Sequence, residues 1–168
     1  MNRVFLLLGG NQGNVSETFE RAKQLIARKA GYVVAESFLY QSEPWGFTSD
    51  NLFLNRVIEV ETQLEPLELL EVLLKIETKL GRTREPGVMA SRPIDIDILF
   101  FNDQVIINQQ LKVPHPRLHL RRFTLEPLAE IAPGLLHPLF AKTTVQLLEE
   151  CNDPLAVTKL DTAAKPAC

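Results

Sequence analysis

The first hundred residues alternate between short apolar runs and segments whose apolar residues repeat at helical spacing. Val4–Leu8 is a continuous apolar run, typical of a buried strand, and a pair of glycines ends it. Apolar residues then recur every three or four positions from Phe19 to Ala30, behind Asn14, a residue suited to cap a helix N-terminus. The chain is therefore expected to open with a strand followed by a helix.

The same alternation continues along the next part of the chain. Tyr32–Tyr40 and Leu52–Thr62 have the composition of strands, and they enclose a polar loop at Gln41–Asn51. Pro66–Leu80 has an apolar stripe at helical spacing and begins with proline, which the first turn of a helix accepts. Ile94–Phe101 is apolar and β-branched, as a strand would be. We therefore expect two strands, a helix and a further strand in this order.

The complete order is strand, helix, strand, strand, helix, strand. It predicts an α+β fold with a ferredoxin-like β-α-β-β-α-β core, in which an antiparallel sheet has helices packed on one face. Helical patterns around Leu125–Ile131 and Thr144–Glu150 predict a small C-terminal helical extension. A single domain is expected over residues 1–160, with a frayed tail at 161–168, and the pattern already fades after Pro154.

Composition narrows the class of protein without naming a function. The 168 residues are 45% hydrophobic and 23% charged, which is ordinary for a globular domain and argues against disorder. A net charge of −3 gives no reason to expect a nucleic acid or an anionic membrane as partner. The N-terminal apolar run is too short for a membrane span or a signal peptide, and the two cysteines suggest no disulfide framework. A cytoplasmic protein is therefore expected.

The local distribution of charge is more informative than the total. Residues 81–122 contain seven Lys and Arg against four Asp and Glu, within a chain that is acidic overall. A basic segment of this kind indicates a local site for an anion.

Asp95 and Asp97 stand within the strand predicted at Ile94–Phe101. Alternate residues of a strand share a face, so the two carboxylates point one way and the isoleucines between them the other. Carboxylates one pleat repeat apart, roughly 6.5–7 Å between Cα atoms, can converge on hard cations such as magnesium. An edge strand with a solvated acidic face would be the plainer explanation, but the apolar continuation of this strand favours a central position and a metal site.

The polar stretch before this strand contains three arginines, Arg82, Arg84 and Arg92, with glycine and proline between them. Guanidinium groups bind phosphate oxygens in pairs, so the stretch has the composition of a loop that closes over phosphates. A solvated basic loop would be the preferred interpretation if the aspartates were absent.

Three further features are weaker. His115 and Arg117 lie in a proline-rich loop and could contact phosphate or ribose, whereas no histidine pair has metal-ligand spacing. Phe53 and Asn55 share one face of a strand, as a stacking ring beside an amide would, although a core Phe and a strand-edge Asn are commoner. Glu77 lies beside an apolar helical stripe, and the sequence leaves open whether it faces a ligand or the rim of the core.

Taken together, these motifs resemble the 6-hydroxymethyl-7,8-dihydropterin pyrophosphokinase family of folate biosynthesis. The resemblance runs from the Leu8-Gly9-Gly10-Asn11 turn to the Ile131-Ala132-Pro133 segment. Its most specific parts are the sequence R-x-x-D-I-D-I-L, from Arg92 to Leu99, and Val113-Pro114-His115 after it.

The resemblance implies transfer of the β,γ-diphosphate of ATP to the pterin hydroxymethyl group, with release of AMP. Asp95 and Asp97 would hold two Mg²⁺ ions. The implied catalytic residues are Arg82, Arg84, Arg92, Asp95 and Asp97. Those implied for ATP are Glu77, Arg84, Arg92, Ile98, Leu111, Lys112, His115 and Arg121. Those implied for the pterin are Ser42, Pro44, Trp45, Phe53, Asn55 and Phe123.

The chain departs from the family pattern at a few positions. Met89-Ala90-Ser91 replace the residues usual before Arg92, Gln110 and Lys112 stand where some members carry Arg and Thr, and Trp45 is bulkier than the aliphatic residue of some relatives. The expected partners are ATP and the pterin, and a monomer is expected. The alternatives are a non-catalytic pterin- or nucleotide-binding homologue and another two-metal phosphoryl transferase on the same fold.

Overall fold

The computed structural model describes residues 1–45, 51–83 and 91–160. Its centre is a six-stranded antiparallel sheet in the order β5-β1-β4-β3-β8, with β2 also paired to β4. The strands are β1 (Asn2–Gly10), β2 (Gly31–Glu36), β3 (Leu39–Ser42), β4 (Phe53–Thr62), β5 (Asp95–Phe101) and β8 (Val157–Leu160). A small separate ribbon pairs β6 (Ile106–Ile107) with β7 (Lys112–Val113).

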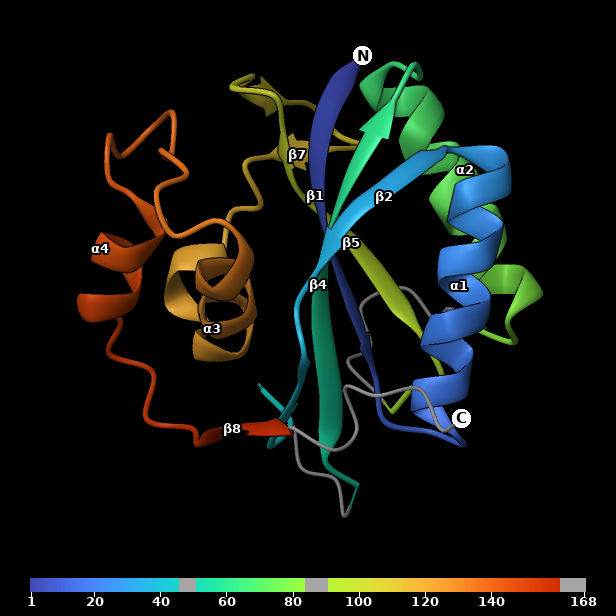
Figure 1. Ribbon diagram of the computed structural model, residues 1–168, viewed down its shortest axis with the longest axis horizontal. Helices are drawn as coiled ribbons and strands as arrows, with labels where there is room; N and C mark the ends of the chain where they lie inside the picture. The colour runs from blue at the N-terminus through green and yellow to red at the C-terminus, as the bar shows by residue number, and fades with distance from the viewer. Residues whose placement is uncertain (46–50, 84–90, 161–168) are drawn as a thin grey trace.

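Helices cover both faces of the sheet (Figure 1). On one face lie α1 (Val15–Lys29) and α2 (Pro66–Lys79), and on the other lie α3 (Arg122–Ile131) and α4 (Thr144–Glu149), preceded by the short 3₁₀ helix η1 (Leu118–Leu120). The α+β class with an antiparallel sheet and a C-terminal helical extension is confirmed. The two core helices α1 and α2 share one face, as expected, and the C-terminal extension packs on the opposite face, a position that the sequence did not predict.

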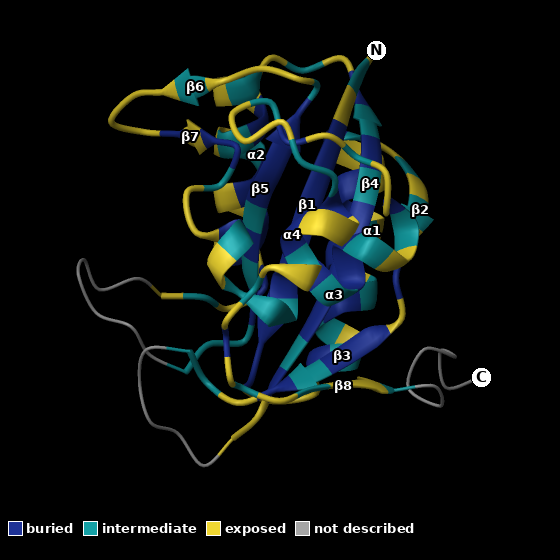
Figure 2. Ribbon diagram, turned by 90° about the vertical axis from the view of Figure 1, so that its left-hand side faces the viewer, coloured by how far each residue is buried: buried dark blue, intermediate teal, exposed yellow. Residues whose placement is uncertain are grey.

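Strand β1 explains why the sheet needs helices on both sides. Its alternate residues Val4, Leu6 and Leu8 belong to the hydrophobic core beneath α1 and α2, and Phe5 and Leu7 belong to the core beneath α3 and α4. All five side chains are buried, and Figure 2 shows this central part of the sheet in the dark blue of buried residues. The continuous apolar run at the N-terminus is therefore the sequence signature of a strand that is buried on both faces.

The strand predicted at Tyr32–Tyr40 is divided into two. The Ser37 hydroxyl accepts the backbone N–H of Val57, and the N–H of Phe38 is directed to the Glu130 carboxylate of α3. Both β2 and β3 pair with β4, and these side-chain bonds replace the backbone ladder to β4 in the short segment that separates them. The single-strand prediction is wrong here because its interruption depends on a residue of the distant helix α3.

The chain after Pro154 is also more ordered than its pattern indicates. Val157–Leu160 forms β8, which pairs with β3 at the edge of the sheet, so the expected fading of structure at Pro154 is wrong. The predicted tail at 161–168 lies outside the described residues. The predicted helix cap is confirmed, because Asn14 accepts the N–H of Glu17, and Thr143 forms a capping box with Gln146 at the start of α4. Within the described parts of the chain, every helix is too short or too polar to cross a membrane.

Candidate active site

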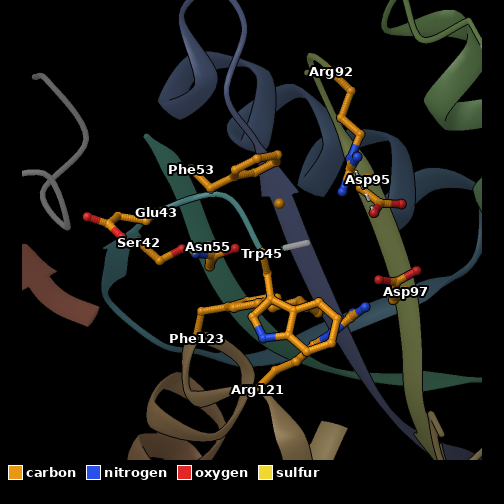
Figure 3. A pocket seen from close by; sticks show the side chains of 12 residues that line it. Ser42, Glu43, Trp45, Phe53, Asn55, Arg92, Asp95, Asp97, Arg121 and Phe123 are labelled. Atoms are coloured by element: carbon orange, nitrogen blue, oxygen red, sulfur yellow. Dashed lines mark hydrogen bonds and ion pairs between the residues drawn. The ribbon is translucent and has the colours of Figure 1, made fainter. Parts of the chain in front are cut away.

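A pocket opens where β1, β4 and β5 meet the loop after β3 and the start of α3 (Figure 3). It encloses roughly 470 Å³, its open mouth included. The lining residues are Leu7, Gly9, Ser42, Glu43, Trp45, Phe53, Asn55, Arg92, Asp95, Asp97, Arg121 and Phe123. Figure 3 shows the two aspartates on the β5 side, and Asn55 and Ser42 across the cavity from them.

Asp95 and Asp97 both line this pocket from the same side of β5, as strand alternation predicts. Asp95 is paired with two arginines. Its Oδ1 lies 2.7 Å from Nη1 of Arg82, and its Oδ2 lies 3.5 Å from Nε of Arg92. The arginines of the predicted phosphate loop therefore meet the predicted metal ligands in the folded chain.

Asp97 is unfavourably placed for a negative charge. Burial and then the neighbouring Asp95 carboxylate raise the pKa of Asp97 to about 8, and Glu77 acts in the same direction, against Arg121 and Arg92. In the absence of a cation, Asp97 is therefore largely protonated at neutral pH. A divalent cation at this pair would remove the cause of that protonation, so the donor set fits a hard metal ion.

The strand that bears the aspartates is held from outside the sheet by α2. Glu77 is buried, and its Oε2 accepts the backbone N–H of Ile96 at 2.7 Å, between the two aspartates. Nη1 of Arg82 donates to the carbonyl of Ile94 at 3.1 Å. The expectation that this strand is central is wrong, because β5 is the edge strand of the described sheet. The side chains of Glu77 and Arg82 replace the missing neighbouring strand and fix the backbone on both sides of Asp95.

Arg92 is held by the turn after β1. Its backbone N–H donates to Oδ1 of Asn11 at 2.8 Å, and its carbonyl accepts the N–H of Asn11 at 2.9 Å. Gly10 lets the two segments approach, because a Cβ there would collide with the carbonyl of Pro93. The Arg92 guanidinium lies over Phe53, 5.1 Å from the ring centroid. Arg92 thus lies between an aromatic ring and Asp95.

The opposite side of the pocket combines aromatic rings with a buried polar pair. Phe53 and Phe123 lie on opposite sides of the cavity (Figure 3). Asn55 is buried and donates from Nδ2 to the Ser42 hydroxyl at 2.9 Å. A Cβ on Gly9 would lie 3.4 Å from Oδ1 of Asn55, so this glycine keeps the β1 side of the pocket open. A flat heterocycle would fit between the rings of Phe53 and Phe123, with its edge facing the amide of Asn55.

Arg121 approaches the aspartates from the start of α3. Its guanidinium carbon lies 4.6 Å from the ring centroid of Trp45 and 5.6 Å from that of Phe123. Burial lowers the pKa of Arg121, whereas Asp97 and Asp95 raise it and the neighbouring Arg117 and Arg92 lower it further. The site therefore gathers several guanidinium groups around two carboxylates.

A second cleft adjoins the pocket on the outer side of β5. It is lined by Leu70, Leu74, Ile96, Asp97, Ile98, Asn108, Gln109, Gln110, Leu111, Lys112, His115 and Pro116. Four residues predicted for ATP, namely Ile98, Leu111, Lys112 and His115, meet in this cleft although they come from different segments. Asp97 lines both cavities, so it stands at the boundary between them.

His115 is neutral in this cleft. Burial, followed by the charge of Arg121, lowers the pKa of His115 to about 4, while Arg117 also lowers it and Asp95 opposes. Its Nδ1 accepts the backbone N–H of Arg117 at 3.1 Å, so the ring proton resides on Nε2. Neutral His115 therefore offers one N–H donor to a ligand.

Several residues assigned to the site from the sequence have a different place in the structure. Glu77 binds the β5 backbone and lines neither cavity. Pro44 is half-buried but does not line the pocket, unlike its neighbours Glu43 and Trp45. Arg84 and the Met89-Ala90 pair lie outside the described residues.

Some contributors were not singled out as site residues from the sequence. Gly9, Leu7 and Glu43 line the pocket, and Asn11 holds Arg92. The glycine pair after a buried strand is the one signal that could have indicated a close approach of backbones there. Within 1–45, 51–83 and 91–160, no group of three or more His, Cys, Asp or Glu is placed to hold a metal ion, so the two aspartates would need ligands from elsewhere.

Comparisons with known proteins identify the family of the chain. The sequence profile of the family described as 7,8-dihydro-6-hydroxymethylpterin-pyrophosphokinase (HPPK) matches residues 5–133. The chain is 36% identical over 172 residues to the 2-amino-4-hydroxy-6-hydroxymethyldihydropteridine pyrophosphokinase of Aquifex aeolicus, covering 100% of this chain and 97% of that one. It is 42% identical over 131 residues to the Bacillus subtilis protein of the same name, covering 77% of this chain and 78% of that one.

Solved structures match the fold. The Plasmodium falciparum HPPK-DHPS crystal structure with STZ-DHP superposes with a TM-score of 0.75 at 19% identity. The match covers 89% of this chain and 43% of that chain, so this chain spans less than half of the larger protein. At this identity the likeness concerns the fold alone.

Proposed function

The chain belongs to the 7,8-dihydro-6-hydroxymethylpterin-pyrophosphokinase family, enzymes of folate biosynthesis with ATP as co-substrate, and we propose how its two cavities divide the reaction. The pocket between Phe53 and Phe123 binds the pterin, and the cleft of Ile98 and Leu111 binds ATP. Asp95 and Asp97 hold magnesium where the cavities meet.

The position of Asp97 carries this proposal. Asp97 lines both cavities, and a reaction between two substrates has to occur where their sites join. Around it lie the cationic groups that phosphate needs: Arg82 and Arg92 beside Asp95, and Arg121 just before α3. Charge and position therefore agree on the same point of the molecule.

The pterin pocket is proposed from shape and polarity. A bicyclic ring between Phe53 and Phe123 would gain stacking on both faces, worth on the order of 1 kcal/mol for each ring beyond burial. Asn55 supplies an amide edge, already oriented by Ser42, which can pair with the donor and acceptor edge of a pterin. Trp45 closes the outer side.

The nucleotide cleft is proposed from the residues that line it. Ile98 and Leu111 offer apolar contacts for a purine, and Lys112 and His115 offer donors to sugar or phosphate. Asn108 shapes this wall, because its Oδ1 accepts the N–H groups of Gln110 and Leu111 at 2.9 and 2.7 Å.

We propose two magnesium ions, held by Asp95 and Asp97 and completed by phosphate oxygens. Magnesium typically uses one or two carboxylates together with substrate phosphates, which fits a site with two protein carboxylates. Bound magnesium would neutralise phosphate oxygens and lower the pKa of the pterin hydroxyl.

The residues of the chain then act mainly by orientation and charge. The hydroxymethyl oxygen attacks the β-phosphorus of ATP, a new P–O bond forms, the bond to the bridging oxygen of AMP breaks, and the hydroxyl proton passes to water. Arg82, Arg92 and Arg121 stabilise the charge on the transferring phosphates. Phe53, Phe123 and Asn55 hold the acceptor in line, which supplies much of the acceleration in a two-substrate transfer.

A monomeric state, a single domain over residues 1–160 and a cytoplasmic location complete the proposal. The single domain rests on the composition, and the location rests on the pair of cysteines, of which Cys151 is a free thiol in the structure.

The decisive experiment combines turnover with binding. Purified protein is incubated with 6-hydroxymethyl-7,8-dihydropterin, ATP and Mg²⁺, and AMP and pterin diphosphate are quantified. Calorimetry with a non-hydrolysable ATP analogue and with the pterin, for wild type and Phe123→Ala, assigns each ligand to its cavity. We expect Phe123→Ala to weaken pterin binding about tenfold and to leave the affinity for the analogue unchanged.

Other outcomes would contradict the proposal. Binding of both ligands without AMP release would indicate a non-catalytic homologue. AMP release without pterin diphosphate would indicate a transferase with another acceptor. Equal losses of affinity for both ligands in Phe123→Ala would show that this ring is only part of the core.

A further inference from the structure

Trp45 is the single tryptophan of the chain, and it belongs to the walls of two cavities. It lines the pocket with Phe53 and Phe123, and it also borders a groove lined by residues of η1 and of the segment that follows α4. Trp45 is only half-buried. Because Trp45 lies between two cavities, core packing contributes little to the orientation of its ring. Its contacts with the adjacent arginines are therefore the interactions to consider.

Those contacts are with two guanidinium groups. Arg121 lies over the Trp45 ring at 4.6 Å from the centroid, and Arg117 lies at 6.0 Å. Tryptophan is the best cation–π partner among the aromatic residues, and the planar guanidinium of arginine stacks on it. In Figure 3, the Arg121 side chain passes beside the Trp45 ring and its nitrogen end lies on the Asp97 side.

One nitrogen of Arg121 is not oriented by any hydrogen bond within the described chain. Its Nε is buried and has no hydrogen-bond partner among the residues that the structure describes. The ring faces of Trp45 and Phe123 therefore contribute to the orientation of its guanidinium plane, beside the attraction of Asp97 and Asp95. A stacked guanidinium has one covered face, and its N–H groups stay directed outward in the plane.

We propose that Trp45 is a positioning residue for phosphate binding, acting through Arg121. The indole fixes the plane of the guanidinium so that its N–H groups face the Asp95–Asp97 pair, where the polyphosphate would lie. This inference rests on the proposed function, because it assumes that Arg121 binds the polyphosphate. It adds to that function a second role for a residue of the pterin pocket, exerted in the absence of pterin.

The single tryptophan gives a direct test. Emission of wild type is recorded while Mg²⁺ and inorganic tripolyphosphate are added without pterin, and binding is followed in parallel by calorimetry. We expect the emission to shift along the binding curve, since the phosphate engages the cation stacked on Trp45. The Arg121→Met variant, which keeps the bulk of the side chain, should lose the shift even when saturated with tripolyphosphate.

The possible outcomes distinguish the role of Trp45 from the proposed phosphate site. Binding by wild type with unchanged emission would overturn the role of Trp45 and leave the proposed function intact. A full emission shift in Arg121→Met would overturn it as well. Failure of wild type to bind tripolyphosphate would contradict both the inference and the phosphate site on which it rests.

Substitutions of Trp45 test whether the aromatic face matters. Trp45→Leu should weaken tripolyphosphate binding about fivefold, equivalent to about 1 kcal/mol, whereas Trp45→Phe should stay within about twofold of wild type. Phe38→Leu is the matched control, because it removes another cation–π pair, with Lys159 at 4.3 Å, and lines neither cavity of the site. Phe38→Leu should leave phosphate binding and turnover unchanged.

The comparison between variants decides the interpretation. Equal losses in Trp45→Phe and Trp45→Leu would show that the π face is irrelevant and would overturn the proposal. Weakened pterin binding with unchanged tripolyphosphate affinity in Trp45→Leu would reduce Trp45 to a wall of the pterin pocket. Thermal unfolding midpoints measured for each variant identify any loss that reflects folding.

Discussion

Two clusters of charged side chains lie on the same sheet, and they are satisfied in different ways. In the first, buried Arg56 of β4 donates from Nε to the carbonyl of Ser37 at 3.0 Å and pairs with Glu20 and Glu36. Lys23 binds the same two carboxylates. Two cations and two anions neutralise each other, so this cluster requires no bound ligand to balance its charge.

The second cluster, at Asp95 and Asp97, does not complete itself. Asp97 has a pKa raised to about 8 by burial and by Asp95, and Arg121 has a buried Nε without a partner in the described chain. Buried charges that remain unsatisfied are expected at sites that bind a charged ligand, whereas self-satisfied clusters stabilise the fold. The state of pairing therefore separates a structural cluster from a functional one.

The substitution expected to have the largest effect on turnover is Asp97→Asn, in the second cluster. Removing the carboxylate should lower turnover by about a thousandfold or more, as loss of a principal electrostatic group does. The free energy of unfolding without magnesium should stay unchanged or increase, because folding no longer requires a buried carboxylate beside Asp95 to be protonated or to carry its charge. Steady-state kinetics at saturating Mg²⁺ and chemical denaturation measure the two effects, and near-normal turnover would show that the metal assignment is wrong.

Arg56→Met should give the opposite result. It leaves Glu20 and Glu36 partly exposed and still paired with Lys23, but the carbonyl of Ser37 loses the buried Arg56 donor, which costs about 1–3 kcal/mol. Because both glutamates are more than a third exposed, the lost ion pairs themselves should add little to this cost. Turnover per folded molecule should not change, since Arg56 lines neither cavity. A stable variant with reduced turnover would remove the distinction between the clusters.

Glu77 tests the boundary between the two kinds of cluster, because it is buried beside the aspartates yet binds the backbone of β5 rather than lining a cavity. Glu77→Gln keeps an oxygen acceptor for the Ile96 N–H, and Glu77→Ala leaves that group without it. We expect Glu77→Ala to lose about 1–3 kcal/mol of stability and to raise the Mg²⁺ concentration needed for half-maximal turnover. Glu77→Gln should retain most of the wild-type stability and should need a Mg²⁺ concentration close to that of wild type. Equal effects on ATP affinity in the two variants would instead indicate that the carboxylate contacts nucleotide.

The predictability of the site follows from how each residue reaches it. Asp95 and Asp97 could be placed on one face from the sequence, because strand alternation is local and needs no knowledge of the fold. The bond from Glu77 to Ile96 could not, because it depends on how α2 packs along the edge of β5. The same reason applies to Asn11 and Arg92, which are distant in sequence and meet through two close backbones.

The fold shows the same division. Apolar runs and helical stripes predicted the central strands and both long helices, since burial imposes a period on the sequence. The interruption at Ser37 and the pairing of β8 were not predictable, because one depends on Glu130 of α3 and the other on an open edge of β3. Local periodicity thus specifies elements, and tertiary hydrogen bonds specify where they end.

The smallest expected effect concerns His137, a buried titratable group that is satisfied internally like the Arg56 cluster. Its Nδ1 accepts the N–H groups of Leu139 and Phe140 at 3.1 and 3.2 Å, and its ring stacks on Phe140 at 4.3 Å. Burial, followed by His119, lowers the pKa of His137 to about 4. The native state therefore retains the neutral ring over a pH range in which the unfolded chain takes up a proton.

Because the native state disfavours protonation of His137, its contribution makes the protein less stable as the pH falls. The contribution of His137 to stability is complete above the unfolded pKa of about 6.5 and is lost as the pH falls toward 4. Each unit of separation is worth at most about 1.4 kcal/mol, and we expect about 1–2 kcal/mol in total. His137→Asn keeps an acceptor for the turn and removes the titration, so its free energy of unfolding should fall less between pH 7 and pH 4 than that of wild type. Parallel pH dependence of the two proteins, measured by urea denaturation, would show that His137 is protonated as easily in the native state as in the unfolded chain.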